Sequence, residues 1–152
     1  MTKTGMKRQT PKKPIKKRET ISSVKKRAWV LFSKCIRIRD CLKTTGCASF
    51  GLCITCGKRY HISLLQAGHF IPGRHNANLF SEKGVHAQCY NCNINLRGNT
   101  LEYRRQINKM YGEGYDEVLE KEAREIKKFT VKDLLELEQD LKNKLKELEH
   151  GS

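Results

Sequence analysis

The stretch VHAQCYNCNINLRGN, residues 85–99, decides the fold because Cys89 and Cys92 are separated by two residues. The same spacing occurs earlier in CITCGKR, at Cys53 and Cys56. Thiolates spaced in this way can face one ion, and two such pairs complete the tetrahedral four-sulfur set that zinc prefers. We therefore predict a structural zinc site. The alternative is four reduced cysteines in the core without a metal.

A four-cysteine site has no open coordination position, so the zinc cannot itself activate water. The metal would close a loop of 32 residues and contribute to folding energy, and any chemistry must come from other residues. The remaining cysteines have no comparable pairing, and we expect core or surface thiols at Cys35, Cys41 and Cys47.

The charge of the chain is unevenly distributed. Residues 1–112 contain 23 Lys and Arg against 4 Asp and Glu, whereas residues 113–152 contain 8 against 12. A positive field of this size attracts polyanions, because each neutralised phosphate releases counterions. We expect nucleic acid as the partner; a merely basic soluble surface or a membrane-surface segment is the alternative.

The start of the chain has no apolar segment typical of a signal peptide, and no run of eighteen apolar residues occurs. We expect a cytoplasmic protein without a membrane partner. Residues 1–19 contain little that could be buried, so they are predicted to form a disordered basic arm. Residues 20–50 predict an amphipathic helix, capped by Ser22 or Ser23 and ending near Asp40, followed by a turn.

Residues 51–112 are predicted to form the central module, and residues 113–152 to form C-terminal helices. The elements expected in the module are strands at residues 64–70 and 84–88, a helix beginning near residues 89–91, and another after the Gly98-Asn99 break. The predicted class is α+β: a small ββα module stapled by the Cys₄ zinc site and flanked by helices.

The last helix should begin near Val131 and has leucines seven residues apart, at Leu134, Leu141 and Leu148. Glu138 interrupts this apolar seam. The helix could pair with a second copy of the chain or pack on the core of its own chain, and the pattern does not separate these two arrangements.

The residues within and after the cysteine pairs resemble a known superfamily. HNH, or ββα-metal, nucleases couple a histidine near HxxP to CxxCN, which here matches His69 with Pro72 and Cys89 with Cys92 and Asn93. More closely, CITCGKR, QAGHFIPGR, HAQCYNCNINLRGN and LEYRRQINKMYGEGYDEVLEKEAR look like the NinG/Rap recombination proteins of bacteriophages. The resemblance implies an endonuclease that acts on branched, Holliday-junction-like DNA in the host bacterial cytoplasm.

The resemblance also implies roles for two residues. His69 would be the general base that removes a proton from the attacking water. Asn93 would place its side-chain oxygen on a catalytic Mg²⁺ or Mn²⁺ ion. Two positions depart from the usual pattern: Gly68 replaces an acidic metal ligand, and Gly84 replaces an asparagine. As substitutes we rank His86 first, as a ligand or active-site partner; Asn78, His75 and His61 are the other candidates.

Basic residues flank the proposed site and suit phosphate contacts to branched or double-stranded DNA: Arg74, Arg97, Arg104, Arg105 and Lys109. Cutting two strands is simplest for a homodimer, with the last helix as a candidate contact. The alternatives to a nuclease are a zinc-stabilised DNA-binding protein without catalysis and an interaction adaptor that uses the acidic C-terminal helices.

Overall fold

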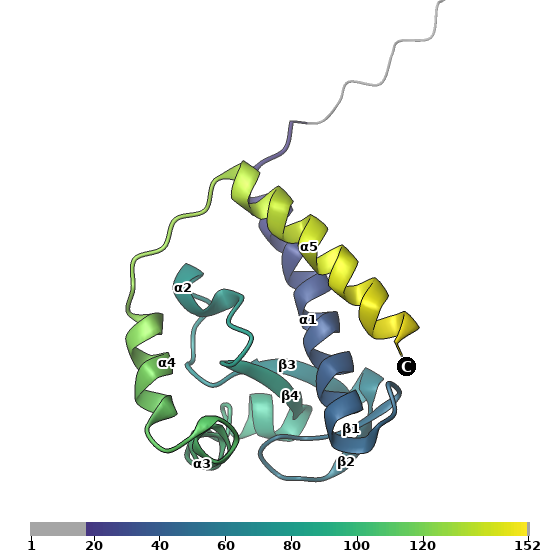
Figure 1. The fold of residues 1–152 in the computed structure, drawn as a ribbon. Coiled ribbons are helices and arrows are strands. Elements are labelled where there is room, and N and C mark those ends of the chain that lie inside the picture. The colour runs from purple at the N-terminus through teal and green to yellow at the C-terminus, as the bar shows by residue number, and fades with distance from the viewer. Residues whose placement is uncertain (1–17, 152) are drawn as a thin grey trace, which may run out of the picture.

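The computed structural model describes residues 18–151, so nearly all of the predicted disordered arm, residues 1–19, lies outside the described part. In chain order the elements are α1 (Ile21–Thr45), β1 (Phe50–Leu52), β2 (Arg59–His61), the 3-10 turn η1 (Ile62–Leu64), β3 (Leu65–His69), α2 (Asn76–Leu79), β4 (Val85–Cys89), the π-helical turn η2 (Asn91–Asn95), α3 (Thr100–Tyr111), α4 (Tyr115–Ala123) and α5 (Val131–His150) (Figure 1). The protein mixes helices with two small antiparallel sheets, β1–β2 and β3–β4.

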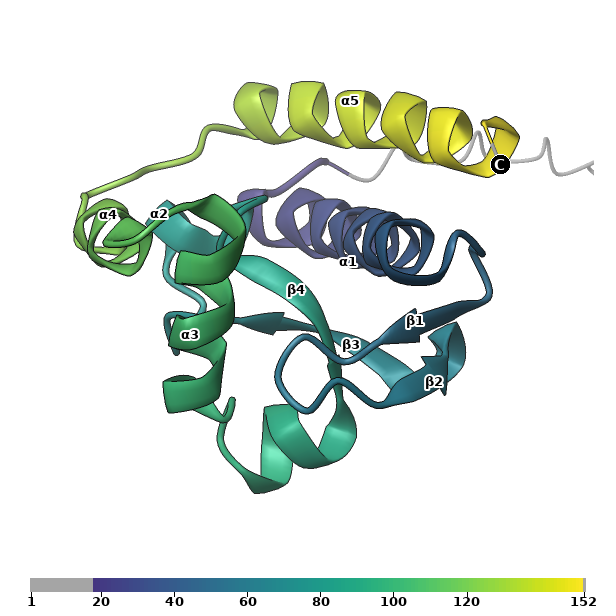
Figure 2. The same ribbon diagram turned by 60° about the horizontal axis from the view of Figure 1, so that its bottom comes forward.

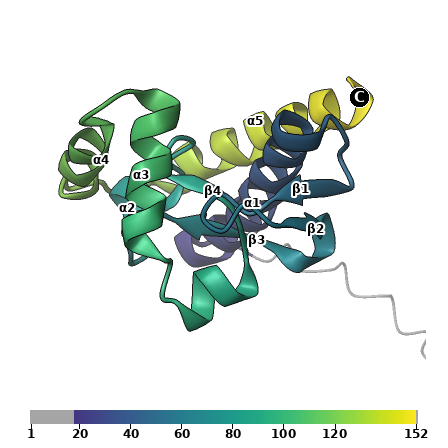
Figure 3. The same cartoon turned by 90° about the horizontal axis from the view of Figure 1, so that it is seen from below.

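The two predicted strands of the central module are confirmed as β3 and β4. They pair antiparallel, with Gly68 opposite His86 and His69 opposite Val85. Because side chains alternate along a strand, residues 68 and 69 point to opposite faces of this hairpin. One face packs on α1, and the other lies toward α3, as Figures 2 and 3 show.

The prediction for the first helix was wrong at both ends. The cap is Thr20, whose hydroxyl accepts from Ser23 N at 3.2 Å while Ser23 Oγ accepts from Thr20 N, a reciprocal capping box. The helix continues past Asp40 to Thr45, because Cys41 still packs inward. It stops at Gly46, which adopts the left-handed conformation with φ 72°.

The segment after α1, predicted as a turn, instead contains the β1–β2 hairpin that presents the first cysteine pair. Gly51 allows this hairpin to lie against α1. A Cβ at residue 51 would lie 2.7 Å from the Cys41 Sγ, which is closer than packed side chains allow. The sequence feature that we missed is therefore Gly51, where the absence of a side chain lets the hairpin approach α1 closely.

Three layers form the centre of the molecule, and Figure 2 shows α1 lying between α5 and the strands. Ala28 and Phe32 of α1 pack with Val85 of β4 and Leu141 of α5. Helix α5 thus packs on its own chain, one of the two arrangements that the leucine spacing allowed. Among residues 18–151, no helix has the length and apolar character needed to cross a bilayer.

Glu138, which interrupts the apolar seam, joins α5 to α1 through an ion pair. Its carboxylate accepts from Arg27 Nε at 2.9 Å, and only 8% of the side chain is exposed. The hydrogen bond from Arg27 lowers the pKa of Glu138 below its usual 4.5. The negative charge of Glu138 is therefore balanced by the positive charge of Arg27 within the α1–α5 contact.

We expect Glu138→Ala to lower the free energy of unfolding by about 1–2 kcal/mol, because Arg27 loses a partly buried partner. The matched control is Glu136→Ala, whose 3.9 Å pair with Lys132 is largely exposed. Thermal unfolding at pH 7 measures both variants. Since the folded pKa of Glu138 is depressed, the difference between wild type and Glu138→Ala should shrink as the pH falls below 4.5. Equal losses in the two variants would contradict a special role for Glu138.

Candidate active site

The fold brings the two cysteine pairs together. The Sγ atoms of Cys53, Cys56, Cys89 and Cys92 all lie within 4.8 Å of one another, and those of Cys56 and Cys89 are 3.9 Å apart. A tetrahedral site with Zn–S bonds of about 2.3 Å places its sulfurs roughly 3.8 Å apart. The four cysteines are thus spaced as a structural metal such as zinc requires, and they could bind one.

Backbone hydrogen bonds shape the first cysteine pair. Cys53 N donates to Lys58 O at 2.9 Å, and Gly57 N donates to Cys53 O at 2.9 Å, with Gly57 in the left-handed region at φ 70°. Burial opposes ionisation of the Cys53 thiol, but hydrogen bonds from the Cys56 backbone and the Thr55 side chain outweigh it and lower the pKa to about 7. Cys53 is therefore held in a form that favours a metal-binding thiolate, whereas burial raises the pKa of the Cys56 thiol to about 12.

His69 ends β3, and its ring is fixed by two contacts. Nε2 lies 3.1 Å from the Leu79 carbonyl oxygen, and the ring stacks on Trp29 with centroids 5.2 Å apart. A carbonyl oxygen can only accept, so Nε2 bears the proton and Nδ1 is left with its lone pair. Within residues 18–151, Nδ1 has no hydrogen-bond partner. Burial lowers the pKa of His69 below its usual 6.5, so the ring is neutral at pH 7.

Asn93 lies in η2, directly after the last cysteine of the cluster. Its Nδ2 donates to Gln66 Oε1 at 2.8 Å, which leaves Oδ1 free to face another group. Oδ1 lies 3.0 Å from the point that a Cβ on Gly68 would occupy. The structure thus places the Asn93 oxygen against the residue that precedes His69.

Gly68 has no room for a side chain, because that space is filled by Gln88 from β4. A Cβ on Gly68 would lie 2.1 Å from Gln88 Oε1. The amide of Gln88 is oriented by its Nε2, which donates to Gly98 O at 3.0 Å and to Thr55 Oγ1 at 3.2 Å. Oε1 is buried and has no hydrogen-bond partner in the described part of the chain. Tyr103 closes this side of the site and donates from its hydroxyl to Gly68 O at 2.7 Å.

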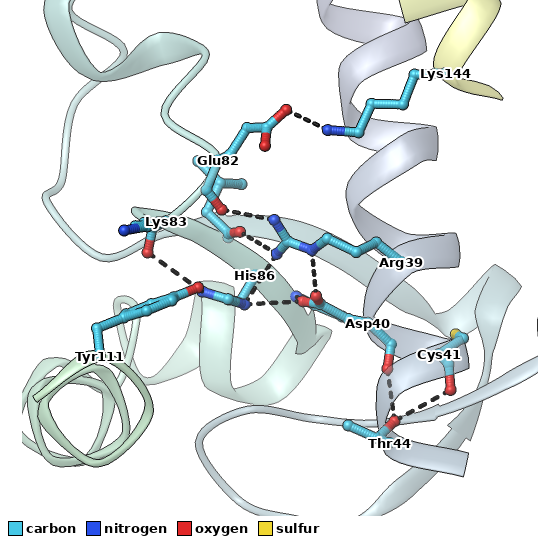
Figure 4. A network of polar contacts seen from close by, with 12 residues as sticks. Arg39, Asp40, Cys41, Thr44, Glu82, Lys83, His86, Tyr111 and Lys144 are labelled. Atoms are coloured by element: carbon cyan, nitrogen blue, oxygen red, sulfur yellow. Dashed lines mark hydrogen bonds and ion pairs between the residues drawn. The ribbon is translucent and has the colours of Figure 1, made fainter. Parts of the chain in front are cut away.

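His86, predicted as an active-site partner, lies in a separate buried network with only 1% of its surface exposed. Its Nδ1 is 3.1 Å from Asp40 Oδ2, and its Nε2 is 3.0 Å from the Tyr111 hydroxyl and 3.2 Å from Lys83 O (Figure 4). Asp40 also accepts from Ala87 N at 2.7 Å, so the network fastens α1 to the outer edge of β4. Both ring nitrogens of His86 have partners, and the geometry favours a structural role.

The other three candidate substitutes make contacts of their own. His61 is exposed and caps η1, where its Nδ1 accepts from Ser63 N at 3.3 Å. His75 is exposed and precedes α2. The Nδ2 of Asn78 donates to Ile71 O at 3.1 Å and to Gly73 O at 3.3 Å, so this side chain braces the loop after β3.

The predicted phosphate-binding residues fall into three groups. Arg74 lies beside the site, with its guanidinium 4.7 Å from the centre of the Trp29 ring that stacks on His69. Arg104 instead pairs with Asp116 at 3.3 Å and with Glu120 at 2.9 Å. Arg105 pairs with Glu102 at 2.9 Å. Arg97 is exposed in the turn between η2 and α3, and Lys109 is exposed on α3.

Two surface hollows meet at Trp29 and Arg74. One lies along α1 and is lined by Lys25 and Lys26, and the other reaches Arg37, Gln66 and Asn93. Sequence reasoning missed Trp29, Gln66 and Gln88. Trp29 is the only tryptophan of the chain, but it stands in a helical pattern, and nothing local indicates that it contacts a histidine forty residues later.

Comparison with known proteins adds one finding. A family model described as bacteriophage lambda NinG protein matches residues 2–151 of the chain. A search of curated proteins and a search of solved structures each found no match. Since the family model covers nearly the whole chain, the protein belongs to the bacteriophage lambda NinG family.

Proposed function

We propose that this protein is a metal-dependent endonuclease that cuts branched, Holliday-junction-like DNA. Family membership suggests a role connected with phage recombination. The observation that supports catalysis is the His69 ring, whose Nδ1 has no partner among residues 18–151. His69 directly follows Gly68, and the free Asn93 oxygen lies 3.0 Å from the point that a Cβ on Gly68 would occupy. An HNH-type ββα site, formed by β3, β4 and the segment that follows, fits this arrangement.

In this mechanism Nδ1 of His69 accepts a proton from the water that attacks the phosphorus. The Leu79 carbonyl holds the Nε2 proton and stabilises the imidazolium that results, while Trp29 fixes the plane of the ring. Asn93 Oδ1 would hold a Mg²⁺ or Mn²⁺ ion, which when bound stabilises negative charge on the phosphoryl oxygens. The cysteine cluster, with zinc as its proposed ion, fixes η2 and so the position of Asn93.

DNA would lie along the two hollows that meet at Trp29 and Arg74. The cations there come from α1 and from the loop after β3, so a phosphate that contacts Arg74 lies near His69. These residues recognise the backbone and carry no base-specific readout. Preference for a branch would then depend on the shape of the charged surface.

The test is cleavage of a labelled four-way junction and of a linear duplex with the same sequences, in Mg²⁺, in Mn²⁺ and in a chelator. We expect cutting of the junction that requires a divalent ion and exceeds cutting of the duplex. Absence of cutting with every ion, despite tight junction binding, would contradict the proposal.

That contrary result would favour a zinc-stabilised DNA-binding protein without catalysis. The observation in favour of this second function is that residue 68 has no side chain and therefore supplies no carboxylate. The two functions share the cations and the cysteine cluster, and they differ only in whether bound DNA is cut.

Arg74→Ala should weaken junction binding more than Arg105→Ala does. Arg74 lies over Trp29 beside the site, whereas Arg105 is already paired with Glu102 on an exposed helix face. We expect Arg74→Ala to reduce the slope of log K against log salt by about one unit, the effect of losing one phosphate contact. Fluorescence anisotropy across a salt series measures both variants. A larger effect for Arg105→Ala would place the DNA on α3 instead.

A further inference from the structure

The strongest unexplained feature of the site is a buried oxygen without a partner. Gln88 is 0% exposed, and a buried amide oxygen that accepts no hydrogen bond is costly. Its orientation is not free, because Nε2 donates to the Gly98 carbonyl, which can only accept. The oxygen is therefore held in place, in the space that a side chain on Gly68 would occupy.

Both this oxygen and that of Asn93 converge on one point. The position of a Cβ on Gly68 lies 2.1 Å from Gln88 Oε1 and 3.0 Å from Asn93 Oδ1. Amide oxygens are suitable ligands for hard divalent cations, which bind oxygen at about 2.0–2.6 Å. The two oxygens therefore lie no more than about 5.1 Å apart, a separation that one ion with bonds of up to about 2.6 Å can bridge.

We propose that Gln88 Oε1 is a ligand of the divalent ion, together with Asn93 Oδ1, and takes the place of the carboxylate that residue 68 does not supply. This inference rests on the proposed function, because it identifies a ligand of the same site. The glycine is then a requirement: a side chain at residue 68 would displace the Gln88 amide. Thr55, between two cysteines of the metal cluster, helps to hold that amide, so the cysteine cluster positions both ligands.

Gln88→Met tests the oxygen, because methionine has nearly the same length and a thioether that binds Mn²⁺ poorly. Mn²⁺ binding to the zinc-loaded full chain is measured by electron paramagnetic resonance of the free ion. The Asn93→Ala variant lacks the other proposed ligand, so the Mn²⁺ that it still binds measures binding at unrelated sites. We expect Mn²⁺ affinity at the site to fall at least about tenfold in Gln88→Met. Zinc content and the thermal unfolding midpoint report on the fold.

Moving the oxygen ligand from residue 88 to residue 68 gives a second test. Gly68→Asp alone should lose Mn²⁺ binding and stability, because its Cβ meets the Gln88 amide. Gly68→Asp combined with Gln88→Ala removes that clash and supplies a carboxylate, so Mn²⁺ binding should return. This double variant decides the question if Gln88→Met fails to fold.

Unchanged Mn²⁺ affinity in folded Gln88→Met would overturn the inference, and junction cleavage by that variant would leave the proposed function intact. Equal Mn²⁺ binding by wild type and Asn93→Ala would also overturn the inference. If wild type then also fails to cut the junction, the proposed function fails with it.

Discussion

His69→Ala is expected to reduce the single-turnover rate of junction cleavage by about 10²–10⁴-fold while the junction dissociation constant changes little. The variant removes the ring nitrogen that we propose as the base, and a positioned general base contributes an effect of this size. His69 is not among the proposed phosphate contacts, so binding should remain. Rapid-quench measurement on pre-bound junction separates the chemical step from association.

The matched control is His61→Ala, which removes an exposed histidine eight residues earlier in the chain. This variant should cut at the wild-type rate. If His69→Ala loses binding and zinc in the same proportion as cleavage, the residue is structural, and its stacking on Trp29 is then the contact that matters.

The wild-type rate should also depend on pH in a defined direction. Burial lowers the pKa of His69 below 6.5, so the base is protonated and inactive only at low pH. As the pH increases, we expect the single-turnover rate to rise with an inflection below pH 6.5, where His69 loses its proton. Titration of His69 should cause little further change in the rate around pH 7. An inflection clearly above pH 7 would be inconsistent with His69 as the base.

Cys53→Ser should abolish stoichiometric zinc binding and cooperative thermal unfolding. The cluster joins the β1–β2 hairpin to the segment after β4, and the apolar contacts around it are few: Tyr60 is the one partly buried hydrophobic residue packed against these cysteines in the described chain. Structural zinc contributes on the order of 10 kcal/mol to folding in small zinc modules. Most of the stability of this region should therefore depend on the ion.

Cys47→Ser is the control, because Cys47 is exposed and lies outside the cluster. It should retain one zinc per chain and unfold at the wild-type temperature. A metal-free Cys53→Ser variant that still melts cooperatively at that temperature would mean that the cysteines form an ordinary core, the alternative that spacing alone leaves open.

Much of this fold could be predicted because its signals are local. The strands at residues 65–69 and 85–89 followed from short runs between turn residues, and the helices after Asn99 and Gly114 followed from apolar periodicity and glycine stops. The clustering of Cys53 and Cys56 with Cys89 and Cys92 followed from spacing, since two pairs of this kind are typical of one metal site.

The rest depends on contacts between distant residues. The end of α1 is set by packing of Cys41 against the Gly51 strand, which no local pattern reveals. Arg104 looks like a free phosphate ligand until α4 brings Asp116 to it. The role of Gly68 is clearer only once Gln88, its diagonal neighbour on the same face of the hairpin, is seen to fill its space.

The state of the His69 ring in zinc-loaded protein is the most direct test of the proposed site. Long-range ¹H–¹⁵N spectra of histidine-labelled protein, assigned by comparison with His69→Ala, report the tautomer and its titration. We expect a neutral ring with the proton on Nε2 at pH 7 and a pKa below 6.5. A proton on Nδ1, or a cationic ring at pH 7, would leave the site without its base and contradict the nuclease assignment.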